Sequence, residues 1–162
     1  MQLYTASERA RRDASRWTVV QGVLAPLQFL AFFVSLVLVL RYLQWGVGYA
    51  AATDSVLVKT ALLYSIMVTG ALWEHDVFGQ YLFARPFFWE DVVSMLVIAL
   101  HTAYVAALSG GWLGPRPLLL LALAAYASYV INAAQFLLKF RAARLQAPRA
   151  LPRAPLAAGA LE

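Results

Sequence analysis

The chain has 162 residues, of which 62% are hydrophobic and 13% carry a charge, and its formal net charge is +5. An average soluble domain has about 25% charged residues, so this composition argues against a soluble protein. Without cysteine, the chain cannot form disulfides, thiolate nucleophiles or cysteine-ligated iron–sulfur clusters. Two histidines are too few for a three-histidine zinc site, and neither a glycine-rich phosphate loop nor a serine-nucleophile elbow occurs. The kind of catalytic chemistry that remains open to this chain is acid–base chemistry with carboxyl groups and histidine.

Residues 1–16 are polar and are expected to form a short lead-in helix, capped by Thr5 or Ser7. Four long apolar runs follow, each long enough to cross a bilayer, which needs roughly 20 helical residues. We expect spans at about 17–42, 55–74, 90–109 and 117–140, within a domain of residues 17–144. Because the chain has too little polar surface to cover four such runs in water, the sequence predicts an all-α bundle of four transmembrane helices.

The two ends of the chain differ in kind. The first apolar run is longer than the hydrophobic core of a signal peptide, and no convincing small-residue cleavage site follows it, so we expect it to be retained. Residues 145–162 are rich in proline and alanine and are expected to be disordered. The last pair, Leu161 and Glu162, could be a cloning remnant.

Basic residues are distributed unevenly between the two sides of the expected bundle. With four spans, both termini and the connection between the second and third spans share one side. That side holds ten of the 13 basic residues: Arg9, Arg11, Arg12, Arg16, Arg85, Lys139, Arg141, Arg144, Arg149 and Arg153. The positive-inside rule therefore predicts that both termini are cytoplasmic. The net charge is explained by topology and lipid contact, and we expect no nucleic-acid partner.

The connection between the second and third spans concentrates acidic and aromatic residues. Four of the eight acids fall between residues 74 and 91: Glu74, Asp76, Glu90 and Asp91. A carboxyl group among aromatic rings at a membrane interface loses solvation, which favours its protonated form and lets it donate a proton near neutral pH. Glu90 and Asp91 could instead stabilise the start of a helix through its dipole, an alternative that Glu74, at a helix C-terminus, lacks.

Polar side chains also recur at helical spacing inside the expected spans: Gln21, Gln28 and Ser35 in the first, Ser94 and His101 in the third, and Ser128, Asn132, Gln135 and Lys139 in the fourth. Polar groups in hydrocarbon usually face the bundle interior, where they can bond neighbouring helices. A buried neutral imidazole is also a good axial metal ligand or proton carrier, so His101 can serve either packing or function.

Five long strings carry a family resemblance: DASRWTVVQGVLAPLQFL, SLVLVLRYL, LVKTALLYSIMVTGALWE, FARPFFWEDVVSMLVIALHTAYVAAL and AAYASYVINAAQFLLKF. They resemble the 3-vinyl (bacterio)chlorophyllide hydratases of bacteriochlorophyll synthesis, in order, from about Tyr4 to Leu145. One departure is His75, because lysine is common in the family after the Trp–Glu pair. This departure argues against His75 as an essential acid.

The resemblance implies a hydro-lyase that adds water across the ring-A vinyl group of chlorophyllide a to give the 3-(1-hydroxyethyl) chlorin. Neither a cofactor nor a metal of the protein's own is implied, since the substrate carries its magnesium. The implied location is the inner (intracytoplasmic) membrane of a photosynthetic bacterium, with the site on the cytoplasmic side. Lipid, other enzymes of the pathway and further copies of the chain are the expected partners.

Hydration of a vinyl group needs a proton donor, and we expect Glu90 in that role, with Glu74 as partner base and Ser94 holding the water. Asp91 is the alternative acid or a helix cap. The remaining site residues are expected to bind the pigment: Arg85, Trp89, Asn132, Gln28 and Gln135. In a second pose, Arg85 holds the propionate at the rim by charge-assisted bonds and the vinyl group points inward, toward His101 and Asn132. His101 could also be an axial ligand of the substrate magnesium.

Two other functions fit part of the pattern. A pigment carrier would ligate a tetrapyrrole through His101 and tolerate loss of the acids, whereas a hydratase needs at least one acid. A proton-coupled transporter would use ionisable residues near the spans, but four spans without an internal repeat argue against it.

Overall fold

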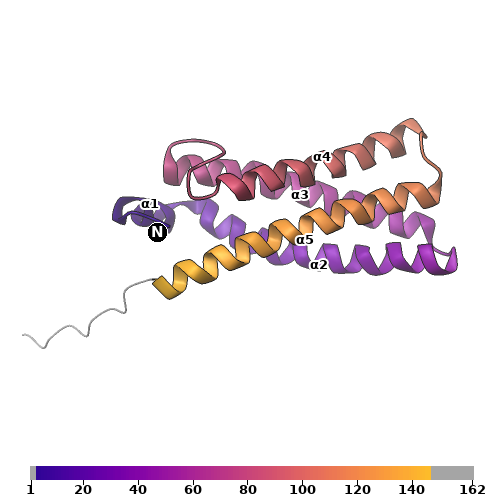
Figure 1. Ribbon diagram of the computed structural model, residues 1–162, viewed down its shortest axis with the longest axis horizontal. Helices are drawn as coiled ribbons and strands as arrows, with labels where there is room; N and C mark the ends of the chain where they lie inside the picture. The colour runs from indigo at the N-terminus through magenta and orange to yellow at the C-terminus, as the bar shows by residue number, and fades with distance from the viewer. Residues whose placement is uncertain (1–2, 147–162) are drawn as a thin grey trace, which may run out of the picture.

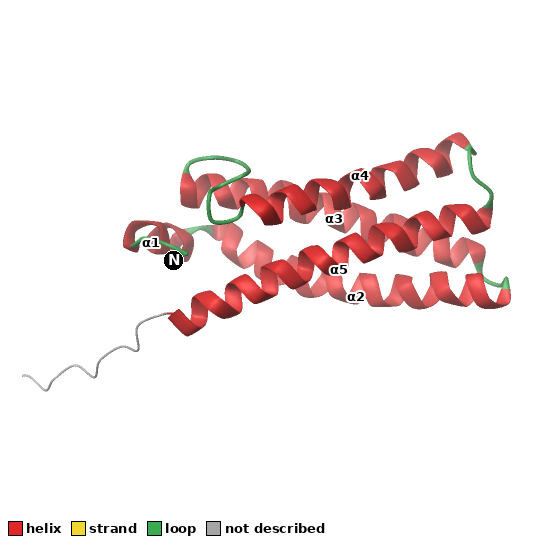
Figure 2. Cartoon of the chain, viewed as in Figure 1, coloured by secondary structure: helices red, strands yellow, loops and turns green. Residues whose placement is uncertain are grey.

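The computed structural model describes residues 3–146 of the chain, with side chains as far as residue 142. Its helices are α1 (Ala6–Ala14), α2 (Arg16–Trp45), α3 (Tyr49–Phe78), α4 (Phe88–Gly110) and α5 (Pro115–Gln146). The described part of the chain contains no strand (Figure 2). Apart from the end of α5, the tail expected at residues 145–162 lies outside the described residues.

Helices α2 to α5 form an elongated bundle, and α1 lies at one end of it, here called the α1 end (Figure 1). This end also holds the loop between α3 and α4 and the last turns of α5. The four helices α2 to α5 are each long and apolar enough to cross a membrane. The predicted all-α fold with four candidate spans is therefore confirmed, while the cytoplasmic location of both termini stays a prediction.

Local signals explain where the helices begin and end. Thr5, rather than Ser7, caps α1: its hydroxyl accepts the Glu8 amide at 3.3 Å, and its own amide donates to the Glu8 carboxylate at 2.6 Å. The pKa of Glu8 is lowered, because its charged carboxylate accepts hydrogen bonds from both the Thr5 amide and the Thr5 hydroxyl. Gly46 and Gly48, with φ of 70° and 84°, end α2 and begin α3 in a left-handed conformation that glycine adopts without strain.

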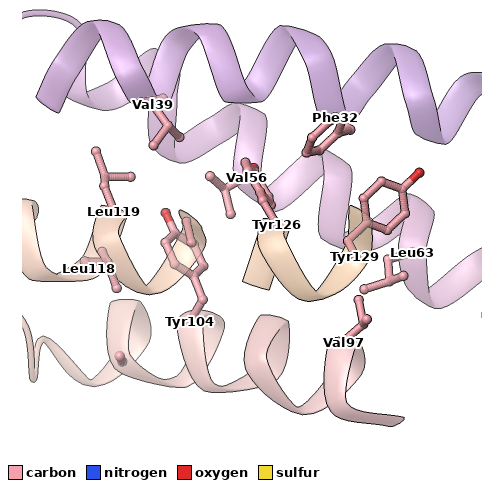
Figure 3. Close-up of a cluster of buried hydrophobic side chains, with 13 residues drawn as sticks. Phe32, Val39, Val56, Leu63, Val97, Tyr104, Leu118, Leu119, Tyr126 and Tyr129 are labelled. Atoms are coloured by element: carbon pink, nitrogen blue, oxygen red, sulfur yellow. The ribbon is translucent and has the colours of Figure 1, made fainter. Parts of the chain in front are cut away.

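The main hydrophobic core, whose side chains Figure 3 draws, lies in the half of the bundle away from α1. Helix α2 packs closely along α3, and α4 along α5, while the contacts between these two hairpins are sparser. The core joins all four helices through Phe32, Val39, Val56, Leu63, Val97, Tyr104, Leu118, Leu119, Tyr126 and Tyr129. Because the hairpins meet tightly only in this half, space remains between them at the α1 end.

A second apolar cluster attaches α1 to the bundle. Tyr4, just before α1, is buried with Val77 and Phe87. Its ring stacks on that of Phe78, with centroids 5.9 Å apart. Burial raises the pKa of Tyr4 to about 12, so its hydroxyl stays protonated at neutral pH. Helix α1 is thus fixed over the α1 end by an aromatic anchor.

Candidate functional site

A cavity of about 860 Å³ lies between the two hairpins at the α1 end. Helix α2 lines it from Thr18 to Phe29 with residues three and four positions apart, as one face of a helix does. Helix α3 contributes residues from Leu63 to Glu74, and α5 contributes residues from Tyr129 to Phe140. The walls are mostly apolar, and the volume lies in the range of small-molecule binding sites, about 300–1,000 Å³.

Two buried carboxyl groups, those of Glu74 and Asp91, lie on the cavity wall and contact each other. Glu74 comes from the last turns of α3, and Asp91 comes from the first turn of α4. Each also accepts a backbone hydrogen bond from the connecting loop: the Phe83 amide donates to Asp91 Oδ2 at 2.7 Å, and the Ala84 amide donates to Glu74 Oε2 at 3.2 Å. The loop therefore holds both acids against the cavity.

Phe83 itself is held in an unusual backbone conformation. Its φ is 61°, and it is the sole non-glycine residue with positive φ in the described part of the chain. The left-handed conformation costs about 1–2 kcal/mol for a residue with a side chain, so the surroundings must stabilise it. The adjacent amides bound to the two acids supply that stabilisation, which ties the shape of the loop to the acid pair.

Ser94 and Asn132 lie about one helical turn further into the cavity. The Ser94 hydroxyl donates to Asn132 Oδ1 at 3.2 Å, and Asn132 Nδ2 donates to the Glu90 carbonyl oxygen at 2.8 Å. Both side chains line the cavity. Because the Ser94 oxygen keeps its acceptor lone pairs, this pair can bind a water molecule next to the acids.

Glu90 does not line the cavity. Its carboxylate forms an ion pair with Lys139 of α5, and the same ammonium group donates to the Pro86 carbonyl oxygen. Lys139 also lies 5.1 Å from the centre of the Phe87 ring. The carboxylate expected to be the proton donor is therefore engaged in joining α4, α5 and the loop.

The cavity mouth carries two arginines that are not among the expected site residues. Arg9 and Arg12 of α1 line it, whereas Arg85 and Trp89 are exposed and lie outside it. Arg12 forms an ion pair with Asp13 at 2.6 Å. The sequence does contain a signal for these two arginines: their spacing of three residues places Arg9 and Arg12 on one face of a helix that precedes the first span.

Side-chain hydrogen bonds fix α1 and the start of α2 against the end of α3. The Trp73 indole donates to the Thr18 hydroxyl at 3.0 Å, and Thr18 donates to the Arg12 carbonyl oxygen at 2.6 Å. Ser15 donates to Asp76 at 2.6 Å. These bonds hold the mouth of the cavity in shape.

His101 lies away from the cavity, buried beside Lys59. Its Nδ1 is 2.8 Å from the Val97 carbonyl oxygen and must donate to it, so Nε2 accepts from Lys59 Nζ at 2.9 Å. The Lys59 ammonium also sits 3.9 Å from the centre of the Tyr129 ring. Both ring nitrogens of His101 are engaged, which leaves no free nitrogen to ligate a substrate magnesium.

The two glutamines expected to bind pigment differ in position. Gln28 lines the inner end of the cavity, whereas Gln135 is outside its wall. A third glutamine, Gln21, also lines the cavity, but its amide already donates to the Ile66 carbonyl oxygen and to the Thr69 hydroxyl. Of the ten expected site residues, the cavity thus gathers Glu74, Asp91, Ser94, Asn132 and Gln28, and not Glu90, His101, Arg85, Trp89 or Gln135.

The fold and this site define a polytopic all-α membrane protein with an acid-lined, largely apolar cavity. Residues 4–142 match the family model of 2-vinyl bacteriochlorophyllide hydratase (BCHF). Two proteins of that name are similar to this chain. The protein of Rhodobacter capsulatus is 68% identical over 145 residues, covering 90% of this chain and 84% of the relative. That of Cereibacter sphaeroides is 69% identical over 144 residues, covering 88% and 89%. No solved structure matches.

The chain therefore belongs to the 2-vinyl bacteriochlorophyllide hydratase family, as the resemblance in the sequence predicted. It is a hydro-lyase of bacteriochlorophyll synthesis. Hydration of a vinyl group needs a proton donor, and the two carboxyl groups on the cavity wall are candidates for that role.

Proposed function

We propose that this protein adds water across the ring-A vinyl group of chlorophyllide a, giving the 3-(1-hydroxyethyl) chlorin. The vinyl group numbered 2 in the relatives' names is the ring-A vinyl group, which carries the number 3 in the other numbering scheme of the macrocycle. The observation that carries the proposal is the contact between the Glu74 and Asp91 carboxyl groups on the wall of a pigment-sized cavity.

The acid pair supplies the proton. Two carboxylates in contact repel each other, and sharing one proton between Glu74 and Asp91 removes the repulsion. The pair transfers that proton to the terminal vinyl carbon, which leaves a cation conjugated with the macrocycle. A water held by Ser94 and Asn132 attacks the cationic carbon and returns a proton to the pair. The steps balance with substrate and water alone, so the reaction needs no further cofactor.

The proton donor in this proposal is the Glu74–Asp91 pair rather than Glu90. The ion pair with Lys139 turns the Glu90 carboxylate away from the cavity, and its backbone oxygen serves to orient Asn132. Glu90 is therefore assigned a positioning role. The pose with the vinyl group near the cavity mouth is the one that this geometry supports.

Arg9 and Arg12 are the proposed partners of the substrate's propionate. A guanidinium group binds a carboxylate by charge-assisted hydrogen bonds, and both arginines lie where a pigment would leave its charged group at the membrane surface. In this pose the flat macrocycle lies among the apolar walls. We place this site at the cytoplasmic face of the inner (intracytoplasmic) membrane, where the basic residues of the α1 end favour it.

A pigment carrier without chemistry is disfavoured by His101, whose two ring nitrogens are both engaged inside the bundle. Incubating the purified protein with chlorophyllide a separates the two functions. Hydration removes a conjugated vinyl group, so the long-wavelength absorption band of the extracted pigment should shift to the blue. Extracted pigment with an unchanged spectrum, despite binding, would establish a carrier and reject the hydratase.

A further inference from the structure

Gln28 presents an amide without a partner to the inner end of the cavity. Its side chain is 1% exposed, and neither its amide nitrogen nor its amide oxygen has a hydrogen-bond partner among the described residues. Gln21, seven residues earlier on the same helix face, has both a carbonyl and a hydroxyl partner. The contrast sets Gln28 apart from a glutamine that bonds neighbouring helices.

A buried amide that makes no hydrogen bond costs about 1–3 kcal/mol. The other residues at this end of the cavity, Phe29, Leu63 and Tyr129, bring two aromatic rings, an aliphatic chain and a single phenol hydroxyl. A polar group in such surroundings is favourable when a ligand brings a complementary polar group to it. The arrangement therefore indicates a ligand with one polar atom at its inner edge.

Gln28 and the acid pair lie at opposite ends of the cavity along the bundle. On α3, Leu63 at the inner end is eleven residues from Glu74, or about 16 Å at 1.5 Å per residue. In a chlorophyllide, the ring-E keto carbonyl is on the edge of the macrocycle diametrically opposite the ring-A vinyl group. A pigment with its vinyl group at the acids directs this carbonyl toward Gln28.

We propose that the Gln28 amide donates a hydrogen bond to the ring-E keto carbonyl of the pigment. This inference rests on the proposed function for the position of the vinyl group. Gln28 would select vinyl chlorins that carry the carbonyl and, by anchoring that edge, hold the vinyl group against Glu74 and Asp91. It is thus a specificity and positioning residue, because it does not touch the reacting carbons.

The test compares chlorophyllide a with its 13¹-deoxo analogue, in which the ring-E carbonyl is a methylene group. Binding to the purified full-length protein is measured by pigment fluorescence titration. Wild-type protein should bind the carbonyl pigment about tenfold more tightly, since one hydrogen bond contributes about 1–1.5 kcal/mol. Gln28→Met, which keeps the length and loses the amide, should bind both pigments equally. Gln135→Met, outside the cavity, should keep the wild-type preference.

Resonance Raman spectra of the bound pigment provide a second readout that a purely structural glutamine would not affect. Hydrogen bonding lowers the keto stretching frequency, so wild-type protein should show a lowered frequency and Gln28→Met a free-carbonyl frequency. If Gln28→Met does not fold, Gln28→Asn, whose amide is one methylene short, should also show the free-carbonyl frequency. A free carbonyl in wild-type protein, or a preference that survives in either variant, would overturn the proposal.

The outcome is separable from that of the proposed function, because neither readout requires turnover. A protein that prefers the carbonyl pigment yet leaves the vinyl group intact would reject the hydratase and keep the Gln28 contact. A protein that hydrates both pigments with equal affinity would keep the hydratase and reject Gln28.

Discussion

At the scale of single residues, the site depends on which of two adjacent acids faces the cavity. Glu90 and Asp91 follow each other in the first turn of α4 and point about 100° apart, so only one can join Glu74. Asp91 contacts Glu74, while Glu90 pairs with Lys139. In the proposed mechanism, Asp91 therefore belongs to the proton-donating pair and Glu90 to the structural ion pair.

The ion pair between Glu90 and Lys139 predicts a loss of stability when one partner is removed. The two side chains are 8% and 25% exposed, so the pair is largely shielded from water. Lys139→Met leaves the Glu90 carboxylate without its partner and should lower the thermal unfolding temperature of the purified protein. Glu90→Gln should do the same and leave most of the specific activity.

The double variant Glu90→Gln/Lys139→Met serves as the control, because it removes both charges. It should recover part of the stability that Lys139→Met loses, as replacing both members of a pair costs less than removing one. Additive losses in the double variant would mean that the two side chains do not interact.

The arginines at the cavity mouth predict a selective binding defect. If Arg9 and Arg12 hold the propionate, the double variant Arg9→Gln/Arg12→Gln should weaken binding of the free-acid pigment and barely affect its propionate methyl ester. Fluorescence titration of both pigments measures the difference. Arg85→Gln is the matched control and should bind both as wild type does. If Arg85→Gln shows the selective defect instead, the propionate binds at the α3–α4 loop and not at Arg9 and Arg12.

At the scale of the elements, α2 contributes two small residues, Gly22 and Ala25, to the lining face of the cavity. Gly22 lies on that face, and a Cβ atom there would meet no atom within 4 Å. A larger side chain at position 22 should therefore be compatible with folding, but it would occupy space in the cavity that a bound pigment needs. The lining face is thus open to a direct steric test.

Gly22→Leu should fill part of the cavity and abolish pigment binding while the protein still folds. Ala61→Leu is the control: it also introduces a leucine, but at an exposed position of α3, and this variant should bind pigment normally. Thermal unfolding and fluorescence titration measure the two properties on the same samples. Normal pigment affinity in Gly22→Leu would show that the pigment binds elsewhere.

The helices themselves were predictable from sequence, because hydropathy and length report directly on membrane spans. The site was predictable only in part. Aromatic neighbours favoured Glu90, but its true partner depends on where α5 brings Lys139, 49 positions away in the chain. The Lys59–His101 contact joins residues 42 apart and gave no local signal either. Both contacts depend on how the helices pack against one another, and the periodicity of the sequence does not report this packing.

At the scale of the whole molecule, the bundle is closed at one end and hollow at the other. The core occupies the half away from α1, and the two acids, the two arginines, Ser94 and Asn132 gather at the α1 end. An amphipathic pigment suits this asymmetry, since its macrocycle can enter the cavity while its flexible propionate chain reaches toward the arginines at the mouth.

The distribution of basic residues between the two ends of the bundle predicts the topology. A reporter fused after Arg144 should be cytoplasmic, and one inserted between Gly46 and Gly48 should be on the opposite side of the membrane. Paired phosphatase and fluorescent-protein fusions distinguish the two compartments. If both reporters lie on the same side, the four-span arrangement and the cytoplasmic site are both rejected.

The central claim is that the Glu74–Asp91 pair delivers the proton, and the hydration rate of Glu74→Gln tests it most directly. The glutamine keeps the shape of the side chain and loses the proton, so pigment binding should persist. The rate of hydration of chlorophyllide a should fall by about 10²–10⁴, the usual effect of removing a general acid. Glu90→Gln, assayed in parallel, should stay within tenfold of wild type. An active Glu74→Gln beside an inactive but folded Glu90→Gln would contradict the account.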